Sequence, residues 1–172
     1  MLGAVEREYD EAGNVAYEKY FGPDGTPTVT EKGYGALRRE YNEQKKVTFE
    51  AWYDTEDRPM PMNGKAYYSL RREYDEAGNL TCERYYGADG EKMLLEDGYH
   101  SYRRETGEDG NPAWIAYYGL DDEPVINTKT GYHRTERTYL DAKHITSEAW
   151  YDTEGSPMTL GDTYVKIERE FD

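Results

Sequence analysis

Hydrophobic and polar residues alternate along short runs that come in pairs. Between Leu70 and Tyr86, the run LRREY is followed by the turn DEAGN and then by the run LTCERYY. Alternation of this kind, in runs rich in Tyr, Val and Thr, is typical of half-buried β-strands. Asp at the first turn position and Gly at the fourth predict a type I turn closed by a left-handed glycine. We therefore expect each pair of runs to form a β-hairpin.

The paired runs recur every 32 or 33 residues, which is the mark of a repeat architecture. One arginine stands at the same place in each repeat: Arg7, Arg39, Arg72, Arg104, Arg137 and Arg169. An aromatic pair ends the second run of each repeat: Tyr20–Phe21, Trp52–Tyr53, Tyr85–Tyr86, Tyr117–Tyr118 and Trp150–Tyr151. A further tyrosine precedes each first run after the opening one: Tyr34, Tyr67, Tyr99, Tyr132 and Tyr164.

This periodicity predicts an all-β fold, a tandem array of about five stacked β-hairpins that is elongated or spirals as a solenoid. A closed ring or small propeller is the alternative, because the chain begins and ends within equivalent runs. A single array would span residues 1–172, in units of about 1–33, 34–66, 67–98, 99–131 and 132–163 with a partial unit over 164–172. The equivalent ends also lead us to expect a fragment of a longer protein.

The amino-acid composition bears on whether the chain can form a core and on which partners it can bind. Leu, Ile, Val and Phe make up only 22 of 172 residues, and the net charge is −15, a combination that is typical of disordered chains. However, 19 Tyr and 3 Trp supply large apolar rings from which a core can be built. The acidity argues against a nucleic-acid partner, because no basic stripe is present. No apolar run approaches the roughly 20 residues of a membrane span. With a single Cys, we expect neither a metal site nor a cofactor.

Strict alternation assigns the side chains of each hairpin to two faces. If Arg7 pairs with Tyr17, the arginines lie on the core face. We then expect each arginine to contact an acidic residue of the second turn in a repeat, which is Asp24, Glu56, Asp89, Asp121 or Glu154. The first member of each aromatic pair, such as Tyr20, would lie on the polar face beside a glutamate such as Glu18.

An exposed aromatic ring beside a carboxylate suits stacking on a sugar or cation–π binding of a quaternary ammonium group. On this argument the predicted ligand-binding residues are Tyr20, Trp52, Tyr85, Tyr117 and Trp150. The competing interpretation is that the first ring of each pair packs beneath the loops of neighbouring repeats. Exposed Trp52 and Trp150 would favour the ligand surface, and buried ones the packing. We expect no enzyme, because a catalytic site is normally unique whereas these features repeat.

Two bacterial repeat families share short motifs with this chain. YDEAGNLT (Tyr74 to Thr81) and YDEAGNV (Tyr9 to Val15) resemble the YD repeats of large bacterial shell and surface proteins. WYDTEGSPMTLG (Trp150 to Gly161) resembles the choline-binding type of cell-wall repeat, in which aromatics of consecutive hairpins form cages. This resemblance implies ligand-binding roles for the residues that match its aromatic pair, which adds Tyr53, Tyr86 and Tyr151 to Trp52, Tyr85 and Trp150 in the predicted set. Both resemblances imply a hairpin array in a protein that is secreted or lies at a bacterial cell surface.

Residues and resemblances together predict a non-catalytic repeat binding module. Its aromatic columns would hold cell-wall glycan or a choline-bearing polymer, and several sites along one array would strengthen weak single contacts. The alternative, from a different class, is a structural spacer or a scaffold for another protein, with no small-molecule ligand.

Overall fold

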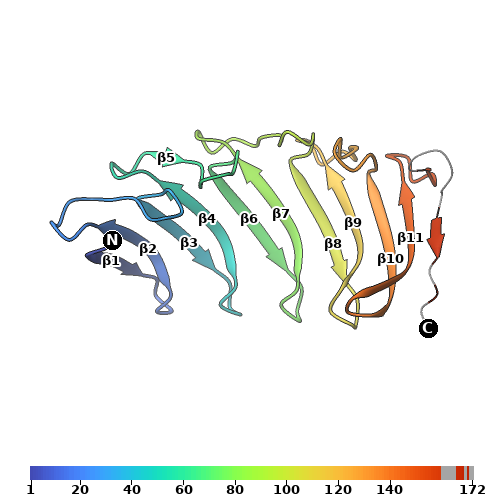
Figure 1. Ribbon diagram of the computed structural model, residues 1–172, viewed down its shortest axis with the longest axis horizontal. Helices are drawn as coiled ribbons and strands as arrows, with labels where there is room; N and C mark the ends of the chain where they lie inside the picture. The colour runs from blue at the N-terminus through green and yellow to red at the C-terminus, as the bar shows by residue number, and fades with distance from the viewer. Residues whose placement is uncertain (160–165, 169, 171–172) are drawn as a thin grey trace. The chain divides into compact units, whose positions relative to one another are not determined.

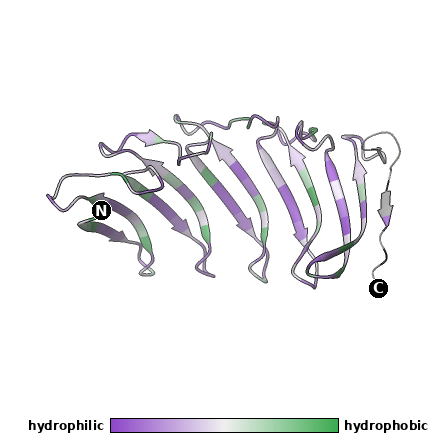
Figure 2. Ribbon diagram, in the orientation of Figure 1, coloured by the Kyte–Doolittle hydropathy of each residue, from purple (hydrophilic) through white to green (hydrophobic). Residues whose placement is uncertain are grey.

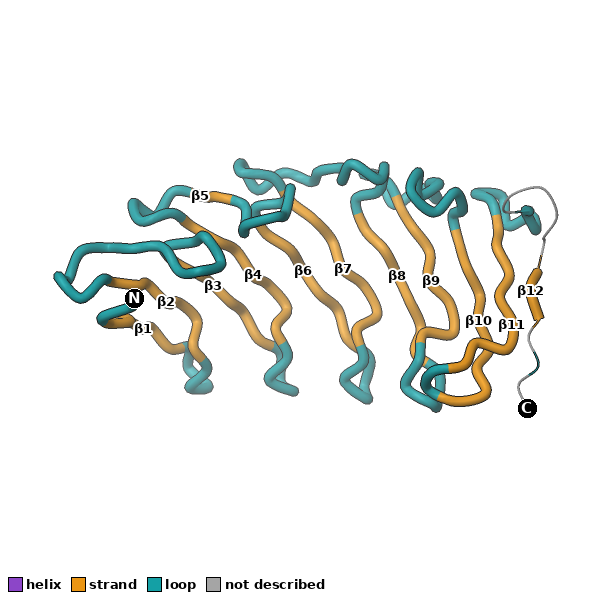
Figure 3. The backbone as a smooth tube through the Cα atoms, in the orientation of Figure 1, coloured by secondary structure: helices purple, strands orange, loops and turns teal. Residues whose placement is uncertain are grey.

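The computed structural model describes residues 1–159, 166–168 and 170. Within these residues every regular element is a β-strand, and turns or loops join the strands (Figure 3). In the part of the chain that the structure describes, no helix is long and apolar enough to cross a membrane. The strands are β1 (Ala4–Tyr9), β2 (Val15–Phe21), β3 (Ala36–Tyr41), β4 (Val47–Tyr53), β5 (Pro59–Met60), β6 (Ser69–Tyr74), β7 (Leu80–Tyr86), β8 (Ser101–Thr106), β9 (Pro112–Tyr118), β10 (Arg134–Asp141), β11 (His144–Tyr151) and β12 (Lys166–Glu168).

Hydrogen bonds join the strands in chain order, β1-β2-β3-β4-β6-β7-β8-β9-β10-β11-β12, and β5 pairs with β4 beside this path. The hairpins β1/β2, β3/β4, β8/β9 and β10/β11 are antiparallel and each closes over a short turn. The predicted all-β tandem array of hairpins is therefore confirmed. Because this order has a first and a last strand, the array is open, and the alternative of a closed ring is wrong.

The chain divides into two compact units. Figure 1 labels the strands from which they are built. Unit one comprises Met1–Arg72 and Tyr85–Met93, and unit two comprises Glu73–Arg84 and Leu94–Asp172. Unit one therefore contains β1 to β5, and unit two contains β8 to β12. Most of the predicted partial unit 164–172, including Arg169, lies outside the described residues.

The turn between β1 and β2 has the predicted geometry. The Gly13 N–H donates to the Asp10 carbonyl over 3.0 Å, and Gly13 has a φ of 83°, which favours glycine. The Asp10 carboxylate accepts from the backbone N–H of Asn14 over 2.8 Å, and the Asn14 side chain donates to its second oxygen. These hydrogen bonds lower the pKa of Asp10.

A β-bulge beside this turn changes the register of the hairpin. Tyr9 pairs with Val15 as expected, but Glu8 then pairs with Tyr17, so that one residue of β2 is extra. The same shift occurs in β3/β4, β8/β9 and β10/β11. The predicted pairing of Arg7 with Tyr17 is therefore wrong by one residue. Since side chains alternate, the bulge exchanges the two faces along most of each second strand.

The resulting packed face carries the core. In unit one it includes Leu37, Arg39, Glu50 and Trp52, and Leu37 pairs directly with Trp52. These two side chains are buried, at 3% and 2% exposure. Tyrosines of the preceding loops cover this face in both units. The ring-centroid distances are 5.9 Å for Tyr20–Tyr34, 5.7 Å for Trp52–Tyr67, 4.6 Å for Tyr67–Tyr85, 4.8 Å for Tyr99–Tyr117 and 6.3 Å for Tyr117–Tyr132.

The arginine column does lie on the packed face, but its partners differ from those predicted. Figure 2 shows hydrophilic stretches on β3, β6 and β10, where Arg and Glu gather. The arginines bond glutamates of the facing strand: Arg7–Glu18 at 2.8 Å, Arg39–Glu50 at 2.7 Å and Arg137–Glu148 at 3.7 Å. Arg104, which faces Ile115, instead donates to the Leu80 carbonyl over 2.9 Å.

The acidic turn residues have local roles. Asp24 accepts from the backbone N–H and hydroxyl of Thr26, over 3.0 and 2.7 Å. Asp89 accepts in the same way from the backbone N–H of Glu91, over 3.0 Å. These bonds close the second turn of the repeat, as Asp side chains do in many turns. The predicted contact between these residues and the arginine column is therefore wrong at both positions.

We predict that Arg39→Met lowers the free energy of unfolding by about 1–3 kcal/mol, because it leaves the mostly buried carboxylate of Glu50 without its arginine. Arg58→Met is the control. Its side chain is 70% exposed beside Asp54, so we expect a change below about 0.5 kcal/mol. Urea unfolding of both variants measures the difference. Equal effects would contradict the role assigned to the arginine column.

Candidate functional site

The open face is the side of the sheet opposite the packed face. In unit one it carries Phe49, Ala51 and Tyr53 on β4, and Ser69 and Arg71 on β6. A hollow of about 270 Å³ lies on it, and we call it the Ser69 hollow. Its lining residues are Phe49, Ala51, Trp52, Tyr53, Pro59, Tyr68, Ser69, Arg71, Tyr86, Gly87, Ala88 and Gly90.

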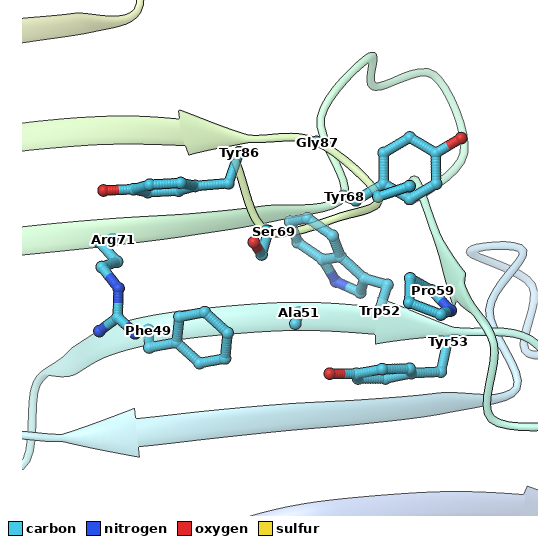
Figure 4. Close-up of a pocket in the computed structure, with 12 residues that line it drawn as sticks. Phe49, Ala51, Trp52, Tyr53, Pro59, Tyr68, Ser69, Arg71, Tyr86 and Gly87 are labelled. Carbon is cyan, nitrogen blue, oxygen red and sulfur yellow. The ribbon is translucent and has the colours of Figure 1, made fainter. Parts of the chain in front are cut away.

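The hollow results from two small residues that meet across β4 and β6. Ala51 pairs directly with Ser69, and both are buried, at 5% and 9% exposure. Larger side chains rise around them. Figure 4 shows Tyr53 and Tyr86 on opposite sides of Ser69, with their hydroxyl groups pointing in the same direction. The small pair forms the floor and the two tyrosine rings form the side walls.

Arg71 and Phe49 close one end of the hollow (Figure 4). The Arg71 guanidinium carbon lies 4.7 Å from the centroid of the Phe49 ring, a cation–π distance. Arg71 also forms an ion pair with Glu40 at 3.4 Å, and both side chains are half exposed or more. The positive charge at this end is therefore balanced by the protein itself.

Arginines lie over aromatic rings at several places on the open face of each unit. The pairs, with distances from the guanidinium carbon to the ring centroid, are Arg38–Tyr17 at 4.6 Å, Arg38–Tyr53 at 5.9 Å, Arg103–Tyr118 at 4.0 Å and Arg134–Trp114 at 4.7 Å. Each contact places a cation against the electron-rich face of a ring. These ring faces are therefore already engaged by the chain.

Asp57 joins two side chains of β2 in unit one. The Lys19 ammonium and the Tyr17 hydroxyl both donate to its carboxylate. The hydrogen bond from Lys19, followed by that from Tyr17, lowers the pKa of Asp57. Burial, together with the same carboxylate, raises the pKa of Tyr17. Asp57 has a φ of 62°, a conformation unusual for any residue but glycine, so its contacts hold it in place.

The predicted ligand residues divide between the two faces. Tyr20, Trp52, Tyr85 and Trp150 are buried, at 8%, 2%, 4% and 5% exposure, and Tyr117 packs between Tyr99 and Tyr132. The prediction that this first column lies on an exposed polar face is wrong, because the bulge turns it to the packed face. Burial of Trp52 and Trp150 is the outcome that favours packing for these rings.

The second column remains accessible. Tyr53, Tyr86 and Tyr151 are partly exposed. Tyr53 and Tyr86 flank the Ser69 hollow, and Tyr151 lines a separate hollow of unit two together with Trp114 and Ser147. These three rings of the predicted set are the ones that a ligand could reach.

Sequence reasoning missed Phe49, Ser69 and Arg71 as members of a site. Strict alternation would place Phe49 on the core face, at the repeat position of Tyr17, and no repeated pattern marks Ser69 or Arg71. The available signal was the juxtaposition of two small residues, Ala51 and Ser69, but it becomes visible only when the register across β4 and β6 is known. Among the described residues, no His, Cys, Asp and Glu side chains form a cluster that could hold a metal ion.

Neither a protein-family model nor a curated protein matches this chain. The likeness to YD repeats and to choline-binding repeats therefore remains a resemblance of short motifs. The functional argument depends on the geometry of the open face.

We predict that the two buried indoles are protected from a neutral quencher. Trp114→Phe removes the one tryptophan that is partly exposed and leaves Trp52 and Trp150. The acrylamide quenching constant of this variant should be several-fold lower than that of free N-acetyltryptophanamide, and it should approach the free value in urea. Strong quenching of the folded variant would contradict the burial of the first aromatic column.

We predict that Asp57 contributes to stability at neutral pH but not in strong acid. Its folded pKa is lower than the ordinary value of about 3.9, so its contribution is complete above that value and is lost as the pH falls through the lower folded pKa. Asp57→Asn, which tolerates the positive φ, should lower the free energy of unfolding at neutral pH and match the parent in strong acid. Urea unfolding at both pH values tests this, and an equal difference at both would contradict it.

Proposed function

We propose that this chain is a non-catalytic repeat binding module that holds cell-wall glycan on its open face. The supporting observation is the Ser69 hollow, where the partly exposed rings of Tyr53 and Tyr86 stand on either side of a small polar floor. The apolar C–H faces of a sugar match aromatic rings. Its hydroxyl groups match the donors and acceptors of Ser69, the tyrosine hydroxyls and Arg71.

The open face suits a glycan better than a choline-like cation. Arg38, Arg103 and Arg134 already lie over aromatic rings, and Arg71 lies over Phe49. A quaternary ammonium group would compete with these guanidinium groups for the same ring faces and would meet their like charge. A neutral sugar meets no such repulsion, and the net charge of −15 does not oppose it.

The resemblance to bacterial surface repeats suggests where such a module would act. A protein that is secreted or displayed on a bacterial cell surface meets cell-wall glycan directly. Single contacts with a sugar ring are weak, and the Ser69 hollow together with the separate hollow at Tyr151 offers a polymer two places of contact.

A structural spacer or a scaffold for another protein is the second candidate. The burial of Trp52 and Trp150 favours it, because these rings serve the packing between repeats and leave no surface for a ligand. In this case the open face would be a solvated surface or would contact another protein.

Retention on purified bacterial sacculi tests the leading proposal. We expect the chain to be retained, to be released by a soluble cell-wall sugar and not to be released by choline. The double variant Tyr53→Ala, Tyr86→Ala should bind at least about tenfold more weakly, which corresponds to about 1.4 kcal/mol.

The matched control for this experiment is Tyr9→Ala, which removes a tyrosine that is 61% exposed on β1. It should leave retention unchanged. Absence of retention on sacculi from several bacteria would contradict the glycan proposal and favour the scaffold.

A further inference from the structure

The small pair beneath the Ser69 hollow has counterparts wherever one hairpin pairs with the next inside a unit. The pairs at this position are Lys19–Ala36, Ala51–Ser69, Arg84–Ser101, Ala116–Arg134 and Ala149–Lys166. Four of them contain one long cationic residue and one small residue. Of these described pairs, only Ala51–Ser69 consists of two small residues.

Three of these four cations are paired with a carboxylate: Lys19 bonds Asp57, Arg84 bonds Glu73, and Arg134 bonds Glu136 at 2.7 Å. At these three positions the array therefore carries an internal ion pair on its open face. At Ala51–Ser69 the cation of that pair is absent.

The carboxylate supplied by the neighbouring turn is absent from the hollow as well. Asp57 and Asp122 occupy the same position of the second turn, with φ values of 62° and 61°, and each bonds a cation of β2 or β8, Lys19 or Arg103. The equivalent residue beside the Ser69 hollow is Gly90, with a φ of 79°. Non-glycine residues at positive φ carry a steric cost, which the ion pairs of Asp57 and Asp122 help to offset. Gly90 avoids this cost and supplies no charge.

The Ser69 hollow thus has small neutral residues at the positions of both partners of the Lys19–Asp57 ion pair. The charge that remains, Arg71, is balanced by Glu40. An added cation would lie near Arg71 without a counter-charge, and an added anion would have to displace Glu40. The hollow is therefore complementary to an uncharged ligand that has an apolar surface for the rings and hydroxyl groups for the floor.

We propose that the Ser69 hollow binds a single neutral hexopyranose ring, at the position where three counterparts carry an internal ion pair. This inference rests on the proposed glycan-binding function and specifies its site and ligand class. Tyr53 and Tyr86 flank the sugar, Ser69 lies beneath it, and Gly87 and Gly90 border it without side chains that would block entry. A volume of about 270 Å³ is below the roughly 300–1,000 Å³ of sites for drug-sized ligands, as expected for one ring.

A variant that refills the hollow provides the test. Ser69→Arg with Gly90→Asp introduces the residue types found at Arg134, Asp57 and Asp122. No atom lies within 4 Å of a Cβ added at Gly90, so the turn has room for the aspartate. Gly25→Asp is the matched control, because Gly25 occupies the same turn position with a φ of 79° and equally free surroundings.

The full chain, labelled with ¹⁵N, is titrated with glucose, N-acetylglucosamine, choline and arginine while its amide resonances are recorded. We expect one or both sugars to shift the amides of Ser69, Gly87 and Gly90. The refilled variant should bind at least about tenfold more weakly, and Gly25→Asp should bind as the parent does. Thermal unfolding confirms that each variant is folded. Should the refilled variant fail to fold, Ser69→Arg alone takes its place with the same expected loss.

The other outcomes each overturn the inference in a recognisable way. Sugar binding that shifts other amides, or that survives in the refilled variant, places the glycan site elsewhere and leaves the proposed function standing. Retention on sacculi without sugar-induced shifts at these amides would likewise place the glycan site elsewhere and leave the proposed function standing. Shifts with choline or arginine alone would make the occupant a cation. Absence of both sugar shifts and retention would end the glycan proposal together with this inference.

Discussion

One extra residue in the second strand of each hairpin is the constraint on which the rest of the structure depends. The β-bulge beside the first turn shifts the pairing by one residue, so that Arg7 faces Glu18 and Leu37 faces Trp52. Because strand side chains alternate between faces, this single shift decides which aromatic column is buried and which remains accessible. Without the bulge, the apolar column of Val15 and Tyr17 would continue unbroken on one face and the arginines would meet tyrosines rather than glutamates.

The packed face combines a few aliphatic side chains with many aromatic rings. Leu37 and Leu70 are almost fully buried, yet most of the covering surface comes from tyrosines stacked between strands and loops. Tyrosine and tryptophan bury large areas per residue, which allows a chain so poor in Leu, Ile and Val to form a core. The arginine–glutamate pairs at the edge of this core reduce the cost of placing charge there, since Glu18 and Glu50 each accept a charged hydrogen bond and Glu148 forms an ion pair with Arg137.

The open face shows how small differences between repeats can create a site in an array. At three of the equivalent positions the repeats carry an internal ion pair of their own, as Lys19 and Asp57 do. At Ala51 and Ser69 both are replaced by small residues and a hollow appears. A repeat protein can acquire a ligand site in this way without altering its backbone, because the register and the turns stay the same.

The repeat period, the hairpins, the turn at Asp10 to Asn14 and the place of the arginines on the core side could all be predicted from the sequence. These features depend on local patterns, namely strand alternation, turn chemistry and spacing along the chain. The buried position of Trp52, the partners of the arginines and the floor of the Ser69 hollow could not. They depend on which residues face each other across strands, and a one-residue bulge changes every such pairing while leaving the composition of the strand unaltered. Local sequence patterns determined where the strands and turns lie. Only the pairing register of the folded sheet decided which side chains of each strand are buried and which remain accessible.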